Sequence, residues 1–191
     1  MDRANDVVSR KSRDGSFVYA GVLDLPFIFD LVLDGSSAGS FSDAYLTRKG
    51  YTKILFLLVT SLHVFRWIFK SKRRELLLFV KHDVPIGFIQ IESSIKPDGD
   101  LYCYVMTCAI SPQFRGNRYG REMLSLLMAR CGAGAEICAV CTKYARAMRR
   151  TLMGLHFVRK SVGLGLDAYT FITPAAEAAT QAASADLMLI R

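Results

Sequence analysis

The chain has 191 residues, of which 51% are hydrophobic and 22% are charged. This composition excludes a disordered chain, and the length favours one domain with one sizeable core. The net charge of +8 indicates an anionic partner, such as nucleic acid, a phosphate-bearing cofactor or an acidic protein face. The net charge alone does not show which of these partners binds. The alternative is that the surplus Lys and Arg side chains are solvated and bind no partner.

The N-terminus and the cysteines predict a reduced, cytoplasmic protein. Residues 1–15 are polar and lack the apolar core of a secretory signal. The five cysteines are an odd number, so we expect free, mostly buried thiols. Cys138 and Cys141 form a C-x-x-C pair, but the surrounding strand pattern would place them on opposite faces. We therefore expect no metal.

Hydrophobic periodicity predicts a regular order of elements along the chain. Expected helices and strands are, in order, strand Phe17–Ala20, a helix from Leu25 that Asp24 caps, helix Thr52–Ser71, strands Leu76–Lys81 and Ile86–Ser93 as a hairpin, strand Asp100–Ile110, helix Gly120–Arg130, strand Glu136–Thr142, helix Lys143–Leu152, and strands His156–Ser161 and Ala168–Ile172. We therefore expect an α/β (α+β) fold, in which about four helices flank a mixed, mostly antiparallel sheet of about seven strands.

The most apolar segment, Ile54–Phe69, raises the question of a membrane. His63 and Arg66 interrupt it, and a spanning helix needs roughly 20 apolar residues. The basic residues that follow would also suit an anionic membrane surface, in which case Thr52–Arg74 would make a peripheral membrane protein. We favour a buried amphipathic helix and expect no membrane association.

The segment Cys108–Leu124 carries the clearest chemical signal. A predicted strand ends at Pro112, and a loop that contains glycines and arginines leads directly into a predicted helix. The first turn of a helix has unpaired N–H groups and a positive dipole end, so it attracts phosphate. Glycines let the backbone approach an anion, and arginines add forked hydrogen bonds. This segment therefore predicts a phosphate site, with a basic β–α connection without a ligand as the alternative.

The segment resembles the signature of the GCN5-related N-acetyltransferase (GNAT) family. Ile110-Ser111-Pro112 matches the strand end V-x-P, and the following loop matches R/Q-x-x-G-x-G/A, except that Arg118 replaces the middle glycine. A non-glycine residue is expected to serve there if its φ is negative. The resemblance implies that the loop binds the pyrophosphate of acetyl-CoA (acyl-CoA) and that the preceding strand pairs with its pantetheine arm. The residues implied are Cys108, Ala109, Ile110, Arg115, Gly116, Asn117, Arg118, Tyr119, Gly120 and Arg121.

The order of elements extends the resemblance over about Phe17–Ile172. It implies a GNAT-like acyltransferase domain at residues 16–173, between a mobile N-terminus at 1–15 and an Ala-rich tail at 174–191. It also implies direct transfer of the acyl group to an amine, with a strand N–H near Ala109 or Ile110 stabilising the oxyanion.

The chain departs from the family at the catalytic residues. In many family members a tyrosine in the pattern Y-x-K-x-G-F acts as the general acid. Leu152 stands at the position of this tyrosine in the present chain, and His156 stands at the position of the glycine. Tyr144 is our candidate to protonate the departing thiolate, with Cys141 or water as alternatives. Glu92 and Asp100 are the candidate bases, although packing or solvated roles would also explain these three residues.

The sequence does not identify the amine acceptor. Three kinds are compatible with it: a small amine, a protein amine and aminoacyl-tRNA. A basic cluster would suit RNA or an acidic protein: Lys143, Arg146, Arg149, Arg150, Arg159 and Lys160. The alternative function is that of a binding module that has the same fold but is catalytically weak or inactive. Such a module would use the basic cluster to bind nucleic acid or a protein partner. A homodimer is compatible with either function.

Overall fold

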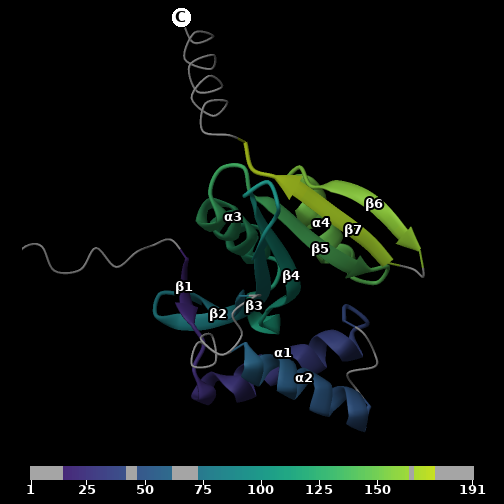
Figure 1. Cartoon of the computed structure of the whole chain (residues 1–191). Coiled ribbons are helices and arrows are strands. Elements are labelled where there is room, and N and C mark those ends of the chain that lie inside the picture. Colours follow the sequence, from purple (N-terminus) through teal and green to yellow (C-terminus); the bar gives the residue numbers. More distant parts are fainter. Residues whose placement is uncertain (1–14, 42–46, 62–72, 164–165, 175–191) are drawn as a thin grey trace, which may run out of the picture.

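The computed structural model describes residues 15–41, 47–61, 73–163 and 166–174 as one open sheet with helices on both faces (Figure 1). The strands are β1 (Ser16–Tyr19), β2 (Arg73–Lys81), β3 (Val84–Ile95), β4 (Leu101–Ile110), β5 (Glu136–Thr142), β6 (Val158–Gly163) and β7 (Leu166–Ile172). The helices are α1 (Leu25–Ser37), α2 (Arg48–Thr60), α3 (Tyr119–Cys131) and α4 (Arg146–Gly154).

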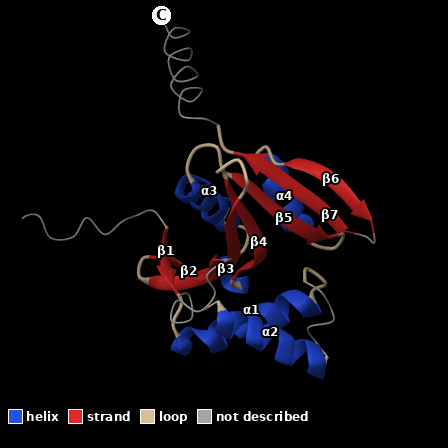
Figure 2. Ribbon diagram, in the orientation of Figure 1, coloured by secondary structure: helices blue, strands red, loops and turns tan. Residues whose placement is uncertain are grey.

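The sheet has the order β1-β2-β3-β4-β5-β7-β6, and β4 and β5 are its one parallel pair (Figure 2). All other neighbours are antiparallel. The parallel pair arises because α3 connects β4 to β5 as a crossover, whereas short turns connect the antiparallel pairs β2–β3 and β3–β4. At the β2–β3 turn, His82 and Asp83 have φ of 52° and 64°, as a two-residue hairpin of type I′ requires. The predicted fold class is confirmed.

Alternation along β2 explains why helices cover both faces. Leu76 and Leu78 pack with residues of α1 and α2, among them Ile28 and Leu58. Leu77 and its neighbour Phe79 pack instead with residues of α3, such as Leu124 and Leu127. Successive strand residues point to opposite faces, so an unbroken apolar run indicates a strand buried on both sides.

Most element boundaries differ by a few residues from the sequence-based expectation, and three starts differ as follows. Helix α2 begins at Arg48, because the Thr47 hydroxyl accepts a hydrogen bond from the Gly50 N–H and caps it. Helix α4 begins at Arg146 and not at Lys143, because a turn in which the Ala145 N–H bonds the Thr142 carbonyl precedes it. Strand β2 begins at Arg73, three residues before the expected strand Leu76–Lys81.

Several sequence expectations lie outside the described residues: the mobile N-terminus at 1–14, the tail beyond residue 174, and most of the second half of the long helix predicted for Thr52–Ser71. Among the described helices, none is long and apolar enough to cross a membrane.

Candidate active site

The two parallel strands separate partway along their length. Strands β4 and β5 pair only from Tyr102 to Val105, opposite Glu136 to Ala139. At this point β4 also has an irregularity in its pairing with β3, where Met106 is the extra residue. A bulge of this kind bends a strand and increases its twist. Beyond this bulge, β4 stays paired with β3 while β5 stays paired with β7, so that β4 and β5 separate. A cavity of about 850 Å³ lies at this split between β4 and β5.

The edge of β4 that borders this split carries free backbone groups. The Ser111 N–H donates to the Ile86 carbonyl of β3 at 2.9 Å. Because antiparallel residues alternate in the direction of their backbone groups, Ala109 also faces β3, and Cys108 and Ile110 face the split. Gly87 supports this register, since a Cβ there would lie 2.5 Å from the Ala109 carbonyl oxygen. Of the two positions predicted for the oxyanion donor, Ala109 and Ile110, only Ile110 presents its N–H group to the split, together with Cys108.

The loop after β4 presents further unpaired N–H groups at the start of α3. The N–H groups of Arg121 and Glu122 bond the Arg118 carbonyl. No described side chain caps the helix, and the N–H groups of Tyr119 and Gly120 have no partner among the described residues. Such a helix start binds anions through its N–H groups and its dipole. The sequence-based phosphate site therefore coincides with one wall of the cavity.

The backbone conformation of Arg118 differs from the one that we expected. We expected a residue that replaces the family's glycine to have a negative φ, but Arg118 has φ of 62° and ψ of 9°, a left-handed conformation. Gly116, two residues earlier, has φ of 84°. His156, at the other family glycine, has φ of 65°. The backbone thus keeps the glycine conformation at both positions while the side chains differ, which costs roughly 1–2 kcal/mol at each.

The first turn of α3 is fixed to β2 and the N-terminal strand. The Glu122 carboxylate accepts a hydrogen bond from Lys81 Nζ at 2.8 Å and another from the Gly15 N–H at 2.8 Å. Burial opposes ionisation of Glu122, but these donors together hold its pKa below its ordinary value. Lys81 also lies 4.9 Å from the centre of the Tyr119 ring. The helix start is therefore held in place before any ligand arrives.

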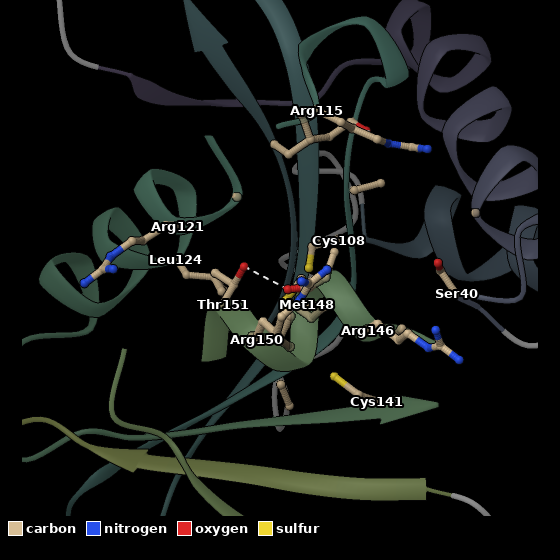
Figure 3. Close-up of a pocket in the computed structure, with 18 of the residues that line it drawn as sticks. Ser40, Cys108, Arg115, Arg121, Leu124, Cys141, Arg146, Met148, Arg150 and Thr151 are labelled. Carbon is tan, nitrogen blue, oxygen red and sulfur yellow. Dashed lines mark hydrogen bonds between the residues drawn. The ribbon is translucent and has the colours of Figure 1, made fainter. Parts of the chain in front are cut away.

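The C-terminal end of α1 bridges the two walls of the split. The carboxylate of Asp34 pairs with the guanidinium of Arg115, whose Nε also donates to the Ile110 carbonyl at 2.9 Å. On the other wall, the Thr142 hydroxyl donates to the Gly39 carbonyl at 3.1 Å. Figure 3 shows Arg115 directed away from Cys108 and towards this helix. Arg115, predicted to contact phosphate, thus holds the loop against α1.

All but one of the predicted cofactor-binding residues line the cavity: Cys108, Ala109, Ile110, Arg115, Gly116, Arg118, Tyr119, Gly120 and Arg121 do, and Asn117 does not. The Asn117 amide donates to the Phe114 carbonyl at 3.3 Å within the loop itself. Sequence reasoning missed Ser40 and Phe41, which line the cavity from the segment after α1. Gly39, whose φ is 72°, was the sequence signal that the chain turns there.

The three predicted catalytic residues do not come together. Tyr144 lines the cavity from the turn after β5 and is 59% exposed. Glu92 pairs with Arg74 of β2 at 2.7 Å and is not a lining residue. Asp100 is exposed in the turn before β4, where its N–H bonds the Asp98 carboxylate, and it does not line the cavity either. Sequence order placed both acids near strand ends but could not show that these ends lie away from the split.

Two cysteine thiols line the cavity, one from each parallel strand (Figure 3). Burial raises the pKa of Cys108 well above its ordinary range. Burial also raises the pKa of Cys141 to about 11, with Asp167 adding to the rise and Arg149 opposing it. Both therefore stay protonated at neutral pH. Cys138 is half-buried and three positions from Cys141, and among the described residues no three His, Cys, Asp or Glu side chains form a metal site.

The predicted basic cluster divides into two parts. Arg149 and Arg159 both pair with the buried carboxylate of Asp167, at 2.9 Å and 3.0 Å. Arg149 also donates to the Tyr169 hydroxyl at 3.0 Å. These two arginines therefore stabilise the packing of α4 on β6 and β7. Arg146 and Arg150 line the cavity instead.

Comparison with known proteins agrees with this architecture. The model of the acetyltransferase (GNAT) family matches residues 44–153, which is more than half of the chain. No curated protein matches the sequence. The fold resembles many solved acetyltransferase structures at low sequence identity.

One of these is a Salmonella typhimurium acetyltransferase that modifies the N-terminal serine of ribosomal protein L7/L12 (TM-score 0.61, 16% identity, 84% of this chain and 96% of that chain). Another is a phosphinothricin acetyltransferase from Sinorhizobium meliloti in complex with acetyl-CoA (TM-score 0.56, 13% identity, 85% and 91%). A third is an acetyltransferase from Thermus thermophilus (TM-score 0.59, 16% identity, 83% and 96%).

The split sheet and the anion-binding helix start define the fold of the acyl-CoA N-acetyltransferases. The chain belongs to the acetyltransferase (GNAT) family, as the family model shows. The resemblance drawn from Cys108–Leu124 is therefore confirmed.

Proposed function

We propose that the protein is an N-acetyltransferase that passes the acetyl group of acetyl-CoA directly to an amine. The observation that carries this proposal is the alignment of two sets of free N–H groups along one cavity. One set is on the edge of β4 at Cys108 and Ile110, and the other is at the start of α3 at Tyr119 and Gly120. Structural neighbours of this fold contain acetyl-CoA, which supports the choice of donor.

The two sets of N–H groups suit two different parts of acetyl-CoA. We infer that the pyrophosphate lies at the N–H groups of α3, with Arg118 and Arg121 adding positive charge. The pantetheine arm carries amide groups, and it would bond the free edge of β4 as an added strand does. The thioester would then reach the split next to Met106, where Cys108 and Cys141 line the cavity.

The proposed reaction is a direct displacement. The nitrogen of a neutral amine attacks the thioester carbon, and the Ile110 N–H donates to the oxygen as negative charge develops there. The C–S bond then breaks, the acetyl group stays on nitrogen, and the amine proton passes to water. The coenzyme A sulfur takes a proton from the Tyr144 hydroxyl, which water then restores.

Tyr144 is our choice of acid because it lines the cavity and is open to solvent, which can return its proton. The Cys141 thiol is buried, and its loss of a proton is disfavoured because burial raises its pKa to about 11. Glu92 and Asp100 are not part of the proposal, because both lie outside the cavity lining.

The donor site can be tested with a thermal shift measurement on the wild type and on Gly120→Ala. Gly120 lines the cavity, and an added Cβ would lie 4.0 Å from Ile110 Cγ1, so the free protein has room for it. Alanine in this helical position should raise the melting temperature without ligand, because glycine costs about 0.5–1 kcal/mol in a helix. The same methyl group would keep the phosphates away from the N–H groups.

Acetyl-CoA should therefore raise the melting temperature of the wild type by mass action and raise that of the variant much less. If millimolar acetyl-CoA does not shift the wild type, the protein is not an acetyl-CoA enzyme. A basic binding module would then be the better account, and its nucleic-acid affinity should fall steeply with salt.

A further inference from the structure

Among the residues that the structure describes, the charged side chains that line the cavity are all arginines. They are Arg115, Arg118, Arg121, Arg146 and Arg150. The ion pair with Asp34 already neutralises Arg115. Arg118 and Arg121 belong to the loop and helix α3, where we place the pyrophosphate. Arg146 and Arg150, both on α4, belong to neither group and need a separate explanation.

Arg146 lies at the opposite side of the cavity, next to the segment after α1. Figure 3 shows Arg121 extending from α3 on one side and Arg146 extending on the other side, where Ser40 also lies. Both Ser40 and Arg146 line the cavity, and the bond from the Thr142 hydroxyl to the Gly39 carbonyl holds their two segments together. We call the opening bounded by Ser40, Tyr144 and Arg146 the acceptor mouth.

Positive charge at the acceptor mouth is concentrated and exposed. Arg146 is exposed, and its N–H bonds the Tyr144 carbonyl at 2.7 Å, which fixes its backbone beside the proposed acid. Lys143 Nζ lies 4.9 Å from the centre of the Tyr144 ring and adds a second cation. Among the described residues, no carboxylate forms an ion pair with Arg146.

The position of Arg146 is also unfavourable for the helix that carries it. It is the first residue of α4, where the helix dipole disfavours a cation. It is also four residues before Arg150, and like charges at this spacing repel. The positive charge of Arg149, three residues later in the helix, is balanced by its ion pair with Asp167. A bound anion at the acceptor mouth would relieve both costs for Arg146.

We propose that the amine acceptor carries an oxyanion, a carboxylate or a phosphate, which Arg146 binds at the acceptor mouth. This inference rests on the proposed acetyltransferase function and names its acceptor class. The planar guanidinium matches both kinds of oxyanion with two parallel hydrogen bonds. The neighbouring cations also disfavour a charged ammonium at the same place, so they favour the neutral amine that attacks the thioester.

The test is a panel of small amines in matched pairs that differ only in the anion. Suitable pairs are glutamate with glutamate diamide, alanine with alaninamide, and phosphoethanolamine with ethanolamine. Release of coenzyme A thiol is followed with saturating acetyl-CoA for the wild type, Arg146→Ala, Arg146→Lys and Lys160→Ala. Lys160 is an exposed cation on β6 outside the cavity lining, so it controls for net charge.

We expect the wild type to prefer the anionic member of at least one pair by tenfold or more in kcat/KM. The Arg146→Ala variant should lose this preference through KM, Arg146→Lys should keep part of it, and Lys160→Ala should keep all of it. Affinity for acetyl-CoA should be equal in all four proteins. Equal loss on both members of each pair, or a preference for the neutral members, would overturn the inference.

The outcomes also separate this inference from the proposed function. If acetyl-CoA does not bind, the proposed function fails. If acetyl-CoA binds but no anionic amine of the panel is acetylated, only the acceptor class is wrong. Acetylation of aminoacyl-tRNA with no activity on the small amines would likewise overturn it and indicate a nucleic-acid acceptor. Carboxylate and phosphate sources are distinguished by which pairs show the preference.

Discussion

Replacing Arg118 by glycine should stabilise the free protein and weaken its binding to acetyl-CoA. Arg118 has φ of 62°, and a side chain in the left-handed region costs roughly 1–2 kcal/mol. Glycine removes that cost but loses more conformational entropy on folding, by about 0.5–1 kcal/mol. From the middle of both ranges, the net gain is about 0.75 kcal/mol, which corresponds to a rise of roughly 1.5–3 °C in Tm for a chain of this size.

The same substitution removes a cation from the wall where we place the pyrophosphate. Loss of one charge-assisted contact should weaken acetyl-CoA binding about tenfold, equivalent to about 1.4 kcal/mol. The assay is thermal unfolding of the free protein together with calorimetric titration of acetyl-CoA. Stability and affinity should therefore change in opposite directions.

Two further variants separate the backbone effect from the charge effect. Arg118→Ala loses the charge but keeps a Cβ in the left-handed region, so Tm should stay nearly constant while affinity falls. His156→Gly relieves φ of 65° at an exposed residue outside the cavity lining, so Tm should rise and affinity should stay constant. A lower Tm for Arg118→Gly than for Arg118→Ala would refute the backbone argument. Unchanged affinity in both would refute the role of the side chain.

Three other variants test the packing, the buried thiol and the proposed acid. Gly87→Ala should lower the free energy of unfolding by about 1–3 kcal/mol, because its Cβ would lie 2.5 Å from the Ala109 carbonyl oxygen; Gly21→Ala, whose Cβ would meet only Asp24 at 3.6 Å, is the control in denaturant titration. Burial raises the pKa of Cys141 from 9.0 to about 11, so the stability that this thiol contributes is present below pH 9 and is lost as pH rises towards 11. The decline in Tm over this range should be shallower in Cys141→Ala, and parallel curves would contradict the assignment. Tyr144→Phe should lower kcat by about 10²-fold or more with little change in the affinity for acetyl-CoA, and an unchanged kcat measured with an accepted amine would exclude Tyr144 as the acid.

The loop and helix start after β4 could be predicted from the sequence because their signals are local. A strand end, two glycines and a helix start follow one another between Ile110 and Gly120, so no long-range contact is needed to place them. The apolar patterns of the β2 and β3 segments likewise predicted strands, because side-chain direction within a strand depends only on position. The order of helices and strands along the chain supported the family resemblance, whereas the order of the strands within the sheet comes from the structure.

The missed features depend on contacts between distant segments. The left-handed backbone of Arg118 could not be predicted from the residue type, because arginine rarely adopts it. Pairing of Arg115 with Asp34 joins residues that are 81 positions apart, and it changes the expected role of that arginine. Glu92 and Asp100 were chosen by chain order, which does not show that the split begins only after Val105. Division of the basic cluster depends on Asp167, whose two arginine partners come from α4 and β6.

Hydrogen exchange measured by mass spectrometry tests the location of the donor most directly. Acetyl-CoA should slow exchange of the amides of Cys108 and Ile110 and of the loop and first turn from Gly116 to Gly120, because these N–H groups would gain partners. Amides of β2 and β3, which the sheet already pairs, should exchange as before. Protection at both segments in the wild type, with much less in Gly120→Ala, is the result we predict. Protection elsewhere, or none at these segments when acetyl-CoA is bound, would contradict the proposed site in the split between β4 and β5.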